Sequence, residues 1–451
     1  MRQMVMVGFL QAQNCTTLAS AWRHPESRTD FTSAAYYQKI GQVLEEGKFQ
    51  LAFFDDRLAM PDIYEGGNPA AVVANGVRVV KLDPVATMLA MGFGTKRLGI
   101  GSTASTTYYE PFDVARRFQT VDHMLGGRAA WNVVTSVNDG EAQNMGREVH
   151  LAHDLRYDRA DEFMEIVLGC WDGWEDDALV VDKNTGLFAQ PDKVHRMEYR
   201  GKFLTSRGTF TVPRSPQGHP VVIQAGSSDR GKRFSARWAE TVFVAYADFE
   251  EAKRQYADFK SEVARLGRDP DLISVNTIAY PVAAATKTEA EDKMALIESL
   301  YREVDGLSLL SEALNFDFAT KGMDEAFTDE ELGGMSGMQA MRDRVMRVIG
   351  RNPTVRDFLE VTRRGRPREA IVGGPKEIAD RLEQWFAEGA CDGYVVGGTH
   401  TPGTFEDFVR FVVPELQRRG IYHRDYTGET LRENLGLPRP TPGAWKAAAS
   451  A

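Results

Sequence analysis

Residues 98–135 read LGIGSTASTTYYEPFDVARRFQTVDHMLGGRAAWNVVT, and this stretch decides the fold. It opens with a short β-rich run, Leu98–Thr103, continues with a helical pattern over Pro111–Leu125 and ends in a second β-rich run, Ala129–Thr135. A strand, a longer helix and another strand in this order are typical of a parallel βα unit. The stretch therefore predicts an α/β fold with a parallel sheet.

The same alternation continues along the chain on both sides of this unit. Further β-rich runs lie at Gln3–Phe9, Gln50–Phe54, Val221–Ala225, Thr241–Ala245, Leu272–Val282 and Gly393–Val396. Further helical patterns lie at Ala34–Glu46, Tyr157–Leu168, Arg230–Ala239, Glu250–Leu266, Lys287–Tyr301, Lys376–Glu388 and Phe405–Arg419. Strands and helices in this number and order predict a closed (β/α)8 TIM barrel, with a Rossmann-like sheet plus an extra domain as the alternative.

Two stretches interrupt the alternation and are too long for ordinary connections between a strand and a helix. Residues 171–219 follow the fourth strand and, with Gly201, Gly208, Pro213 and Pro216, predict an insertion rich in hairpins. Residues 305–368 follow the seventh strand and carry glycines among Met and Phe residues, which is typical of a mobile lid. We expect one barrel domain over 1–451 with these two insertions and a C-terminal tail at 420–451.

The composition favours a small-molecule partner. The 451 residues carry a formal net charge of -10 with both signs interspersed, which disfavours nucleic acid and an anionic membrane surface as partners. The acidic excess also disfavours the steering of polyanionic substrates, although local patches of charge could reverse this. Cys15, Cys170 and Cys391 form no CxxC pair, so we expect neither a disulfide framework nor a zinc site, as in a cytoplasmic protein. No apolar run reaches the length of about 18 residues that a membrane span needs.

Polar residues gather where the predicted strands end, and the active site of a TIM barrel is built there. Asp55 and Asp56 follow the second strand, Thr103 ends the third and Asn132 lies in the fourth. Adjacent residues at a strand end point to opposite faces, so only one of the two aspartates is expected to face the pocket.

The segment QAGSSDRGKRFSARW places Gly226, Ser227 and Ser228 between a strand and a helix, where free backbone N–H groups can hold a phosphate. A serine here also commonly caps the helix, and capping alone is the alternative. His153 and Tyr157 are four residues apart at another helix start, so both can reach one ligand, or can serve only as structural hydrogen bonders.

Other catalytic patterns are missing. The 8 histidines show neither HxH nor HExxH spacing, so no metal-ligand set is expected, and no GxSxG, GxGxxG or GxxxxGK motif is properly placed before a helix. Cys15 and His24 follow the first strand and are candidates for the mouth of the pocket; a cysteine there is either a catalytic thiol or inert packing.

Taken together, these residues resemble the bacterial luciferase-like superfamily, and within it the group of nitrilotriacetate and dibenzothiophene sulfone monooxygenases. The resemblance covers nearly the whole chain. It is carried by WRHP (22–25), FFDDRLA (53–59), TYYEPFDVARRFQTVDHMLGGRAAWNVVTS (107–136), HDLRYDRADEF (153–163), QAGSSDRGKRFSARWAE (224–240) and TGETLRENLGL (427–437). This chain differs from the family at one point: where family members commonly have Ala-Asp after the second strand, it has Asp55 and Asp56.

The resemblance implies FMN at the carboxyl ends of the strands. Asp56, Thr103 and Asn132 would lie near the flavin ring or ribityl chain, and His153, Tyr157, Ser227 and Ser228 near the phosphate. The candidates for the substrate pocket are Cys15, His24, Tyr64 and Trp131. No catalytic acid or base is identified.

The resemblance also implies the chemistry. Reduced FMN from a separate NAD(P)H:flavin reductase and O2 would oxygenate a small organic substrate, a class that includes xenobiotic compounds, through a C4a-(hydro)peroxyflavin, as in the two-component class. A homodimer or homotetramer is expected. The alternatives are a deazaflavin F420-dependent oxidoreductase of the same superfamily and a flavin-binding protein without catalysis.

Overall fold

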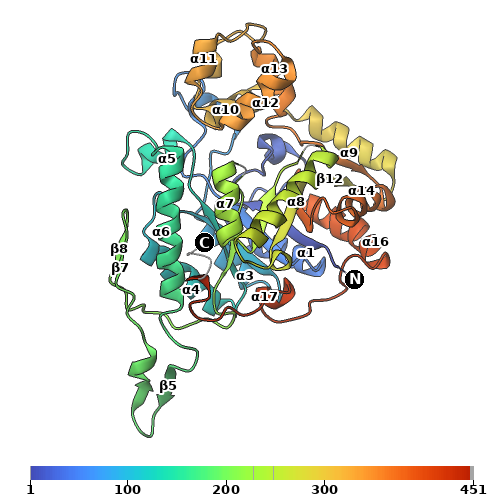
Figure 1. Ribbon diagram of the computed structural model, residues 1–451. Helices are drawn as coiled ribbons and strands as arrows, with labels where there is room; N and C mark the ends of the chain where they lie inside the picture. Colours follow the sequence, from blue (N-terminus) through green and yellow to red (C-terminus); the bar gives the residue numbers. More distant parts are fainter. Residues whose placement is uncertain (1, 227, 247, 447–451) are drawn as a thin grey trace.

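Eight parallel strands close into a barrel surrounded by helices in the computed structural model, which describes residues 2–226, 228–246 and 248–446 (Figure 1). The strands pair around the barrel in the order β1-β14-β11-β10-β9-β4-β3-β2. They are β1 (Val5–Gln11), β2 (Leu51–Asp55), β3 (Gly99–Ser105), β4 (Ala129–Val134), β9 (Val221–Gln224), β10 (Thr241–Val244), β11 (Ser274–Ala279) and β14 (Gly393–Gly397). The predicted TIM barrel is confirmed, and the Rossmann-like alternative is wrong.

The helical layer packs its apolar faces against the strands. Helix α4 begins with Pro111 at its first position and buries Val114, Ala115, Phe118 and Val121, which recur at helical spacing. The helices of this layer are α1 (Ala34–Glu46), α2 (Ala70–Asn75), α3 (Pro84–Gly92), α4 (Pro111–Met124), α5 (Asp139–Asn144), α6 (His153–Trp171), α7 (Asp229–Trp238), α8 (Phe249–Arg265), α9 (Lys287–Ser299), α14 (Pro375–Ala387), α15 (Gly403–Asp407), the π-helical turn η5 (Phe408–Val412) and α16 (Val413–Arg418).

Strand register brings polar residues to one level at the carboxyl ends of the strands. Gln11 of β1 pairs with Asp55 of β2, and Thr103 of β3 pairs with Asn132 of β4. Below them the barrel interior is apolar, with Val7, Leu51, Phe53, Ile223 and Val395 in one cluster. Polar side chains therefore gather where the strands end, and a second buried polar contact, from the Asn276 amide to the Thr241 hydroxyl at 2.8 Å, lies near the start of β10 and β11.

The seventh predicted strand divides into two. Ser274–Ala279 forms β11 of the barrel, whereas Pro281–Ala283 forms β12, which pairs with β13 (Ile371–Gly373) outside it. Local apolar character does not show that the chain changes partner at Tyr280, because both halves are buried and suited to strands.

The segment 171–219 forms two antiparallel strand pairs, β5 (Leu179–Asp182) with β6 (Leu187–Ala189) and β7 (Tyr199–Arg200) with β8 (Thr205–Ser206). Figure 1 shows the first of these pairs projecting away from the barrel. Leu179, Val181, Leu187 and Phe188 of this hairpin are exposed.

The segment 305–368 forms a small helical roof, which lies at one end of the barrel in Figure 1. We call α10 (Glu303–Leu314), α11 (Asp329–Gly334), α12 (Gln339–Ile349) and α13 (Val355–Thr362) the roof. It has its own apolar core, which includes Leu310, Phe318, Phe327 and Phe358. A buried ion pair from Arg23 to Asp305, 2.7 Å long, joins the roof to the loop after β1.

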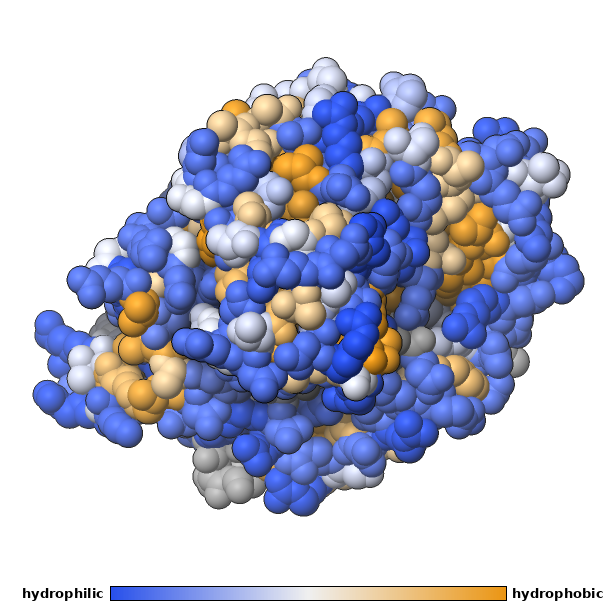
Figure 2. All heavy atoms as spheres, turned by 90° about the horizontal axis from the view of Figure 1, so that it is seen from above, coloured by the Kyte–Doolittle hydropathy of each residue, from blue (hydrophilic) through white to orange (hydrophobic). Residues whose placement is uncertain are grey.

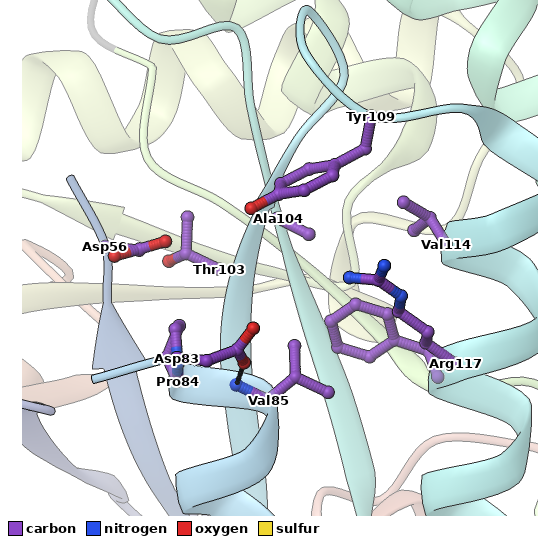
Figure 3. Close-up of a pocket in the computed structure, with 10 residues that line it drawn as sticks. Asp56, Asp83, Pro84, Val85, Thr103, Ala104, Tyr109, Val114 and Arg117 are labelled. Carbon is purple, nitrogen blue, oxygen red and sulfur yellow. Dashed lines mark hydrogen bonds between the residues drawn. The ribbon is translucent and has the colours of Figure 1, made fainter. Parts of the chain in front are cut away.

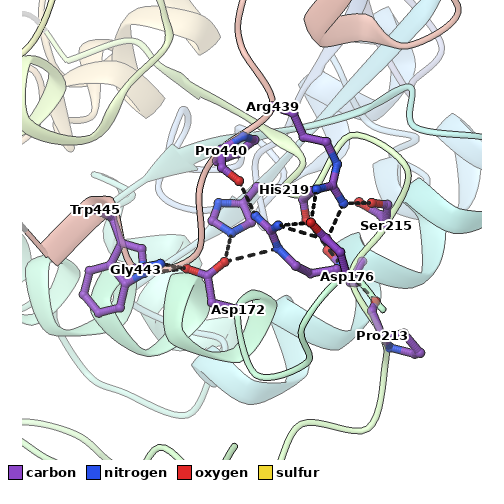
Figure 4. Close-up of polar contacts among 12 residues, drawn as sticks. Asp172, Asp176, Pro213, Ser215, His219, Arg439, Pro440, Gly443 and Trp445 are labelled. Carbon is purple, nitrogen blue, oxygen red and sulfur yellow. Dashed lines mark hydrogen bonds and ion pairs between the residues drawn. The ribbon is translucent and has the colours of Figure 1, made fainter. Parts of the chain in front are cut away.

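The C-terminal tail closes the opposite end of the barrel. Leu431 of α17 (Leu431–Asn434) and Leu437 pack into the interior cluster. Farther along, Asp172 accepts hydrogen bonds from the Gly443 backbone N–H at 2.7 Å and the Trp445 indole at 3.0 Å, and also contacts His219 (Figure 4). The tail is therefore a docked part of the barrel.

Within the described part of the chain, every helix is too short or too polar to cross a membrane.

Candidate active site

Adjacent strands bring Asp56 and Thr103 together in one small cavity, which we call the ring end of the site (Figure 3). The Tyr109 hydroxyl is directed toward them in the same view. The Thr103 hydroxyl donates to the Phe54 carbonyl at 3.0 Å and accepts from the Asn132 amide at 2.9 Å. The Asn132 carbonyl oxygen is buried and has no hydrogen-bond partner among the residues that the structure describes, so it is open to a donor from a ligand.

The carboxyl groups at the ring end hold protons more strongly than ordinary ones. Burial raises the pKa of Asp56 from 3.8 to about 7, and the charge of Lys81 only partly opposes this. Burial also raises the pKa of Asp55, against the charges of Arg78 and Arg57. At neutral pH, Asp56 therefore exchanges between its protonated and its ionised form.

The second half of the site lies at the start of α7, and we call it the phosphate end. The Ser228 hydroxyl accepts from the Gly231 backbone N–H at 3.1 Å and lies 3.2 Å from His153 Nε2. Burial raises the pKa of the Tyr157 phenol, which also hydrogen-bonds Ser228. Ser227 lies outside the described residues.

The capping interpretation of this segment is confirmed, and phosphate binding stays a prediction. Ser228 does cap α7, yet its hydroxyl also contacts His153, an exposed side chain that reaches across from α6. A helix start with a hydroxyl, an imidazole and a phenol fits a phosphate, since helix N-termini favour anions and each of these groups can donate. With the unpartnered Asn132 oxygen at the ring end, the residues fit FMN.

The structure gives the predicted residues of the substrate pocket other surroundings than a pocket. Trp131 is wrong, because it points away from the barrel interior: its ring is fully buried against Phe118, Phe163 and Trp171, and its N–H donates to Ala104. Strand alternation explains this, since Asn132 faces inward and its neighbour must face outward.

The other three candidates serve packing. Cys15 lies in an apolar cluster with Leu18 and Val282, and burial raises its pKa to about 11, so the reactive thiolate is not formed at neutral pH. Tyr64 packs against the apolar core of the roof. His24 is buried and stacks face to face on His400, with ring centroids 3.7 Å apart.

His24, Glu26 and His400 nevertheless bring possible metal-ligand atoms within 4.8 Å of one another, a grouping that sequence spacing did not reveal. Glu26 and His400 lie far apart along the chain, so no local motif marks them. The stacked imidazole rings lie nearly parallel, with an interplanar angle of 14°, and this arrangement serves packing.

Sequence reasoning also missed charged residues beside the ring end. A second cavity is lined by Arg57, Arg78 and Lys81 together with Asp55 and Asp56. The adjacent letters of FFDDRLA were the one available signal for Arg57; Arg78 and Lys81 lie in a stretch without a motif.

Comparison with known proteins places this site in a family. The model of the luciferase-like monooxygenases matches residues 14–392. The chain belongs to the luciferase-like monooxygenase family. The resemblance seen in the sequence is thereby confirmed, and so is the monooxygenase class.

Relatives cover almost the full length. The dibenzothiophene-sulfone monooxygenase of Rhodococcus erythropolis is 41% identical over 97% of this chain and 98% of its own. Component A of the nitrilotriacetate monooxygenase of Aminobacter aminovorans is 38% identical over 93% of both chains. A crystal structure of riboflavin lyase with modified FMN and riboflavin superposes with a TM-score of 0.89, at 30% identity, over 100% of this chain and 99% of that one.

Proposed function

We propose that this protein is the oxygenase component of a two-component system, which takes reduced FMN from a separate NAD(P)H:flavin reductase and oxygenates a small organic molecule. The monooxygenase class and the use of reduced FMN and O2 follow from the family. The observation that supports the site is that the ring end and the phosphate end both lie where the strands end, and each offers polar groups suited to one part of FMN.

Reduced FMN supplies the two electrons with which one atom of O2 enters the substrate while the other leaves as water. The residues hold and shield it: Thr103 and Asn132 would position the ring, and His153, Tyr157, Ser227 and Ser228 the phosphate. Asp56 would hold a proton at its carboxyl oxygen, because its pKa of about 7 lies near the working pH.

The roof is proposed as the lid that excludes water, which would otherwise divert oxygen chemistry to hydrogen peroxide. Asp317 of the roof accepts from the backbone N–H groups of Glu65 at 3.0 Å and Gly66 at 2.7 Å, in the loop after β2. Figure 2 shows the molecule from above, with a mostly hydrophilic outer face on which apolar residues gather in separate patches.

The test uses the purified protein with FMN, NADH, O2 and a separately added flavin reductase. Product is expected only with both proteins present. NADH oxidation by this protein alone, at the rate of product formation, would show that the two-component assignment is wrong. Reconstitution with F420 in place of FMN tests the oxidoreductase alternative, and bound FMN without substrate-dependent oxygen uptake across a broad panel would favour the non-catalytic one.

We also propose that the protein is a homodimer or homotetramer in the cytoplasm. The hairpin β5–β6 supports an association between copies, because Val181 and Phe188 are 49% and 64% exposed on a projecting hairpin. Light scattering should show a smaller particle for Val181→Lys with Phe188→Lys. An unchanged mass would remove this hairpin from the interface. Three buried, unpaired cysteines agree with a reducing compartment.

A further inference from the structure

Four cations gather beside the ring end, and among the described residues none of them forms an ion pair with a carboxylate within 4.0 Å, although the buried Glu312 carries a charge nearby. Arg78 and Lys81 lie in the loop after β2, and Arg364 and Arg368 lie in the segment after the last helix of the roof. All four are half-buried. Half-buried arginine and lysine side chains normally pair with carboxylates, so a group without such pairs indicates a missing anion.

Their hydrogen bonds are to neutral groups. Arg78 donates to the Thr17 carbonyl at 2.7 Å, Lys81 to the Ala59 carbonyl at 2.8 Å, and Arg364 contacts the Met338 sulfur at 3.9 Å. The Nε–H groups of Arg78 and Arg364 are buried and unpartnered in the described part of the chain. Arg57, by contrast, lies 3.8 Å from Glu141.

The nearby acids do not neutralise this charge. Burial would raise the pKa of Glu312, but the charges of Lys81, Arg57 and Arg78 outweigh it and hold the pKa low, so Glu312 is ionised. It supplies one negative charge. Asp55 and Asp56 hold protons more strongly than usual. Burial lowers the pKa of Arg364 well below its ordinary value, and Arg368 and Arg78 lower it further, which reflects an excess of like charge.

The position of this group relates it to the proposed reaction. Arg78 and Lys81 line the second cavity, and Asp56 lines both this cavity and the one at the ring end, so the two adjoin. Gln11 pairs with Asp55 across the strands, and its buried side chain hydrogen-bonds the Asp55 carboxyl. The cavity holds about one water molecule, so a larger group could enter only if the surrounding residues moved apart.

We propose that Arg78, Lys81, Arg364 and Arg368 bind an anionic oxygen group of the substrate, a carboxylate or a sulfonate, and so place its remainder toward the ring end. The inference rests on the proposed function, because it assigns a substrate class to that site. An anion would pair the free guanidinium donors and relieve their mutual repulsion. The net charge of -10 is then no guide to substrate charge, because the cations are concentrated in one pocket.

The test compares anionic probes with neutral analogues of similar shape, at constant ionic strength. Succinate and methanesulfonate are titrated into the purified chain beside succinamide and dimethyl sulfone, and binding is followed by calorimetry and by the melting temperature. We expect the anions to bind and stabilise the protein, and the neutral probes to do neither. Equal responses to succinate and succinamide would overturn the proposal.

Variants locate the effect. Arg364→Met and Lys81→Met keep the side-chain bulk and are each expected to weaken binding of the anions about 10-fold or more. The matched control is Arg347→Met, an exposed residue of α12, which should bind them as the parent does. Circular dichroism checks folding, and the use of two variants on different segments guards against one that fails to fold. Equal losses in all three variants would contradict the assignment.

FMN affinity, measured by quenching of flavin fluorescence, separates this proposal from the function on which it rests. The two variants are expected to bind FMN as the parent does. If the variants lost FMN affinity but bound the anions as the parent does, the cations would bind the phosphate of FMN and the inference would be overturned. If the parent protein bound the anions but did not bind FMN, the anion site would stand and only the proposed function would be contradicted.

Discussion

The two ends of the barrel differ in how particular buried arginines are paired. At the end closed by the tail, Arg432 and Glu240 form two parallel hydrogen bonds of 2.7 and 2.8 Å, and Glu240 also accepts from the Val222 N–H. At the end covered by the roof, Arg78 and Arg364 each keep a buried donor unpartnered. Both ends unite segments that are far apart in the sequence. The roof end also holds the buried Arg23–Asp305 pair, but its Arg78 and Arg364 have no ion pair within 4.0 Å among the described residues.

This difference distinguishes a structural end from a functional one. A buried charge with all its partners in the protein fixes the chain in place, whereas a buried charge that lacks partners costs stability and is retained where a ligand completes it. In TIM barrels the carboxyl ends of the strands carry the active site, and the opposite end serves stability. The charges of this chain follow the same division.

The largest expected effect comes from breaking the pair at the tail end. Glu240→Gln would leave the buried Arg432 charge uncompensated and should lower the free energy of unfolding by about 3 to 5 kcal/mol. Burial would raise the pKa of Glu240, but Arg432 outweighs it and holds the pKa low. The stability from this pair is therefore present above the ordinary carboxyl pKa and is lost as pH falls through the lowered value. Urea unfolding across pH measures both.

The control for this variant is Glu291→Gln, which removes the exposed 3.7 Å pair with Lys287 on α9. An exposed pair of this kind contributes less than about 1 kcal/mol. FMN affinity should stay at the parental value in both variants. If Glu240→Gln weakened FMN binding while the protein remained folded, the two ends would not be independent.

A smaller effect, on a different quantity, is expected at the phosphate end. Tyr157→Phe removes one hydroxyl and should weaken FMN binding by about 1 to 3 kcal/mol with little loss of fold. Ser228→Ala should weaken it to a similar degree, and it also removes the cap of α7, which costs about 1 kcal/mol of stability. Fluorescence titration with FMN and thermal unfolding measure the two effects separately.

The control here is Ser33→Ala, because Ser33 caps α1 by accepting from the Tyr36 N–H at 3.2 Å. It should lose stability like Ser228→Ala but keep its FMN affinity. Unchanged FMN affinity in both Tyr157→Phe and Ser228→Ala would count against the proposed phosphate end.

The contrast also explains what the sequence could reveal. All eight barrel strands were predictable, because each is a short apolar run next to a helical pattern and local character determines it. The cap of α7 was equally local, since Ser228 caps the helix that follows it, whereas its contact with His153 joins two helices that are 75 positions apart. The division of β11 from β12 was not predictable, because it depends on pairing with β13, which lies 90 positions further along the chain.

The roof end was hidden for the same physical reason. Arg78 and Arg364 belong to segments that meet only through tertiary packing, and neither segment carries a motif. Trp131 was misplaced because an aromatic residue at a strand end suits a pocket, whereas its inward neighbour Asn132 already determined which face it takes.

The smallest effect is expected at Asp56, where the two ends can be compared through pH. Its pKa in the folded protein is about 7 and its ordinary value is 3.8, so the folded state binds more protons between these values and the free energy of unfolding falls as pH rises through them. Asp56→Asn should flatten that slope and raise stability near pH 7 by about 1 kcal/mol, a figure reduced because the side chain is half-buried. This is opposite in sign to Glu240, whose contribution grows with rising pH. If Asp56→Asn lowered stability at pH 7, the Asp56 carboxylate would have stabilising partners in the protein, as Glu240 has. The contrast between the two ends would then fail at the residue proposed to lie near the flavin.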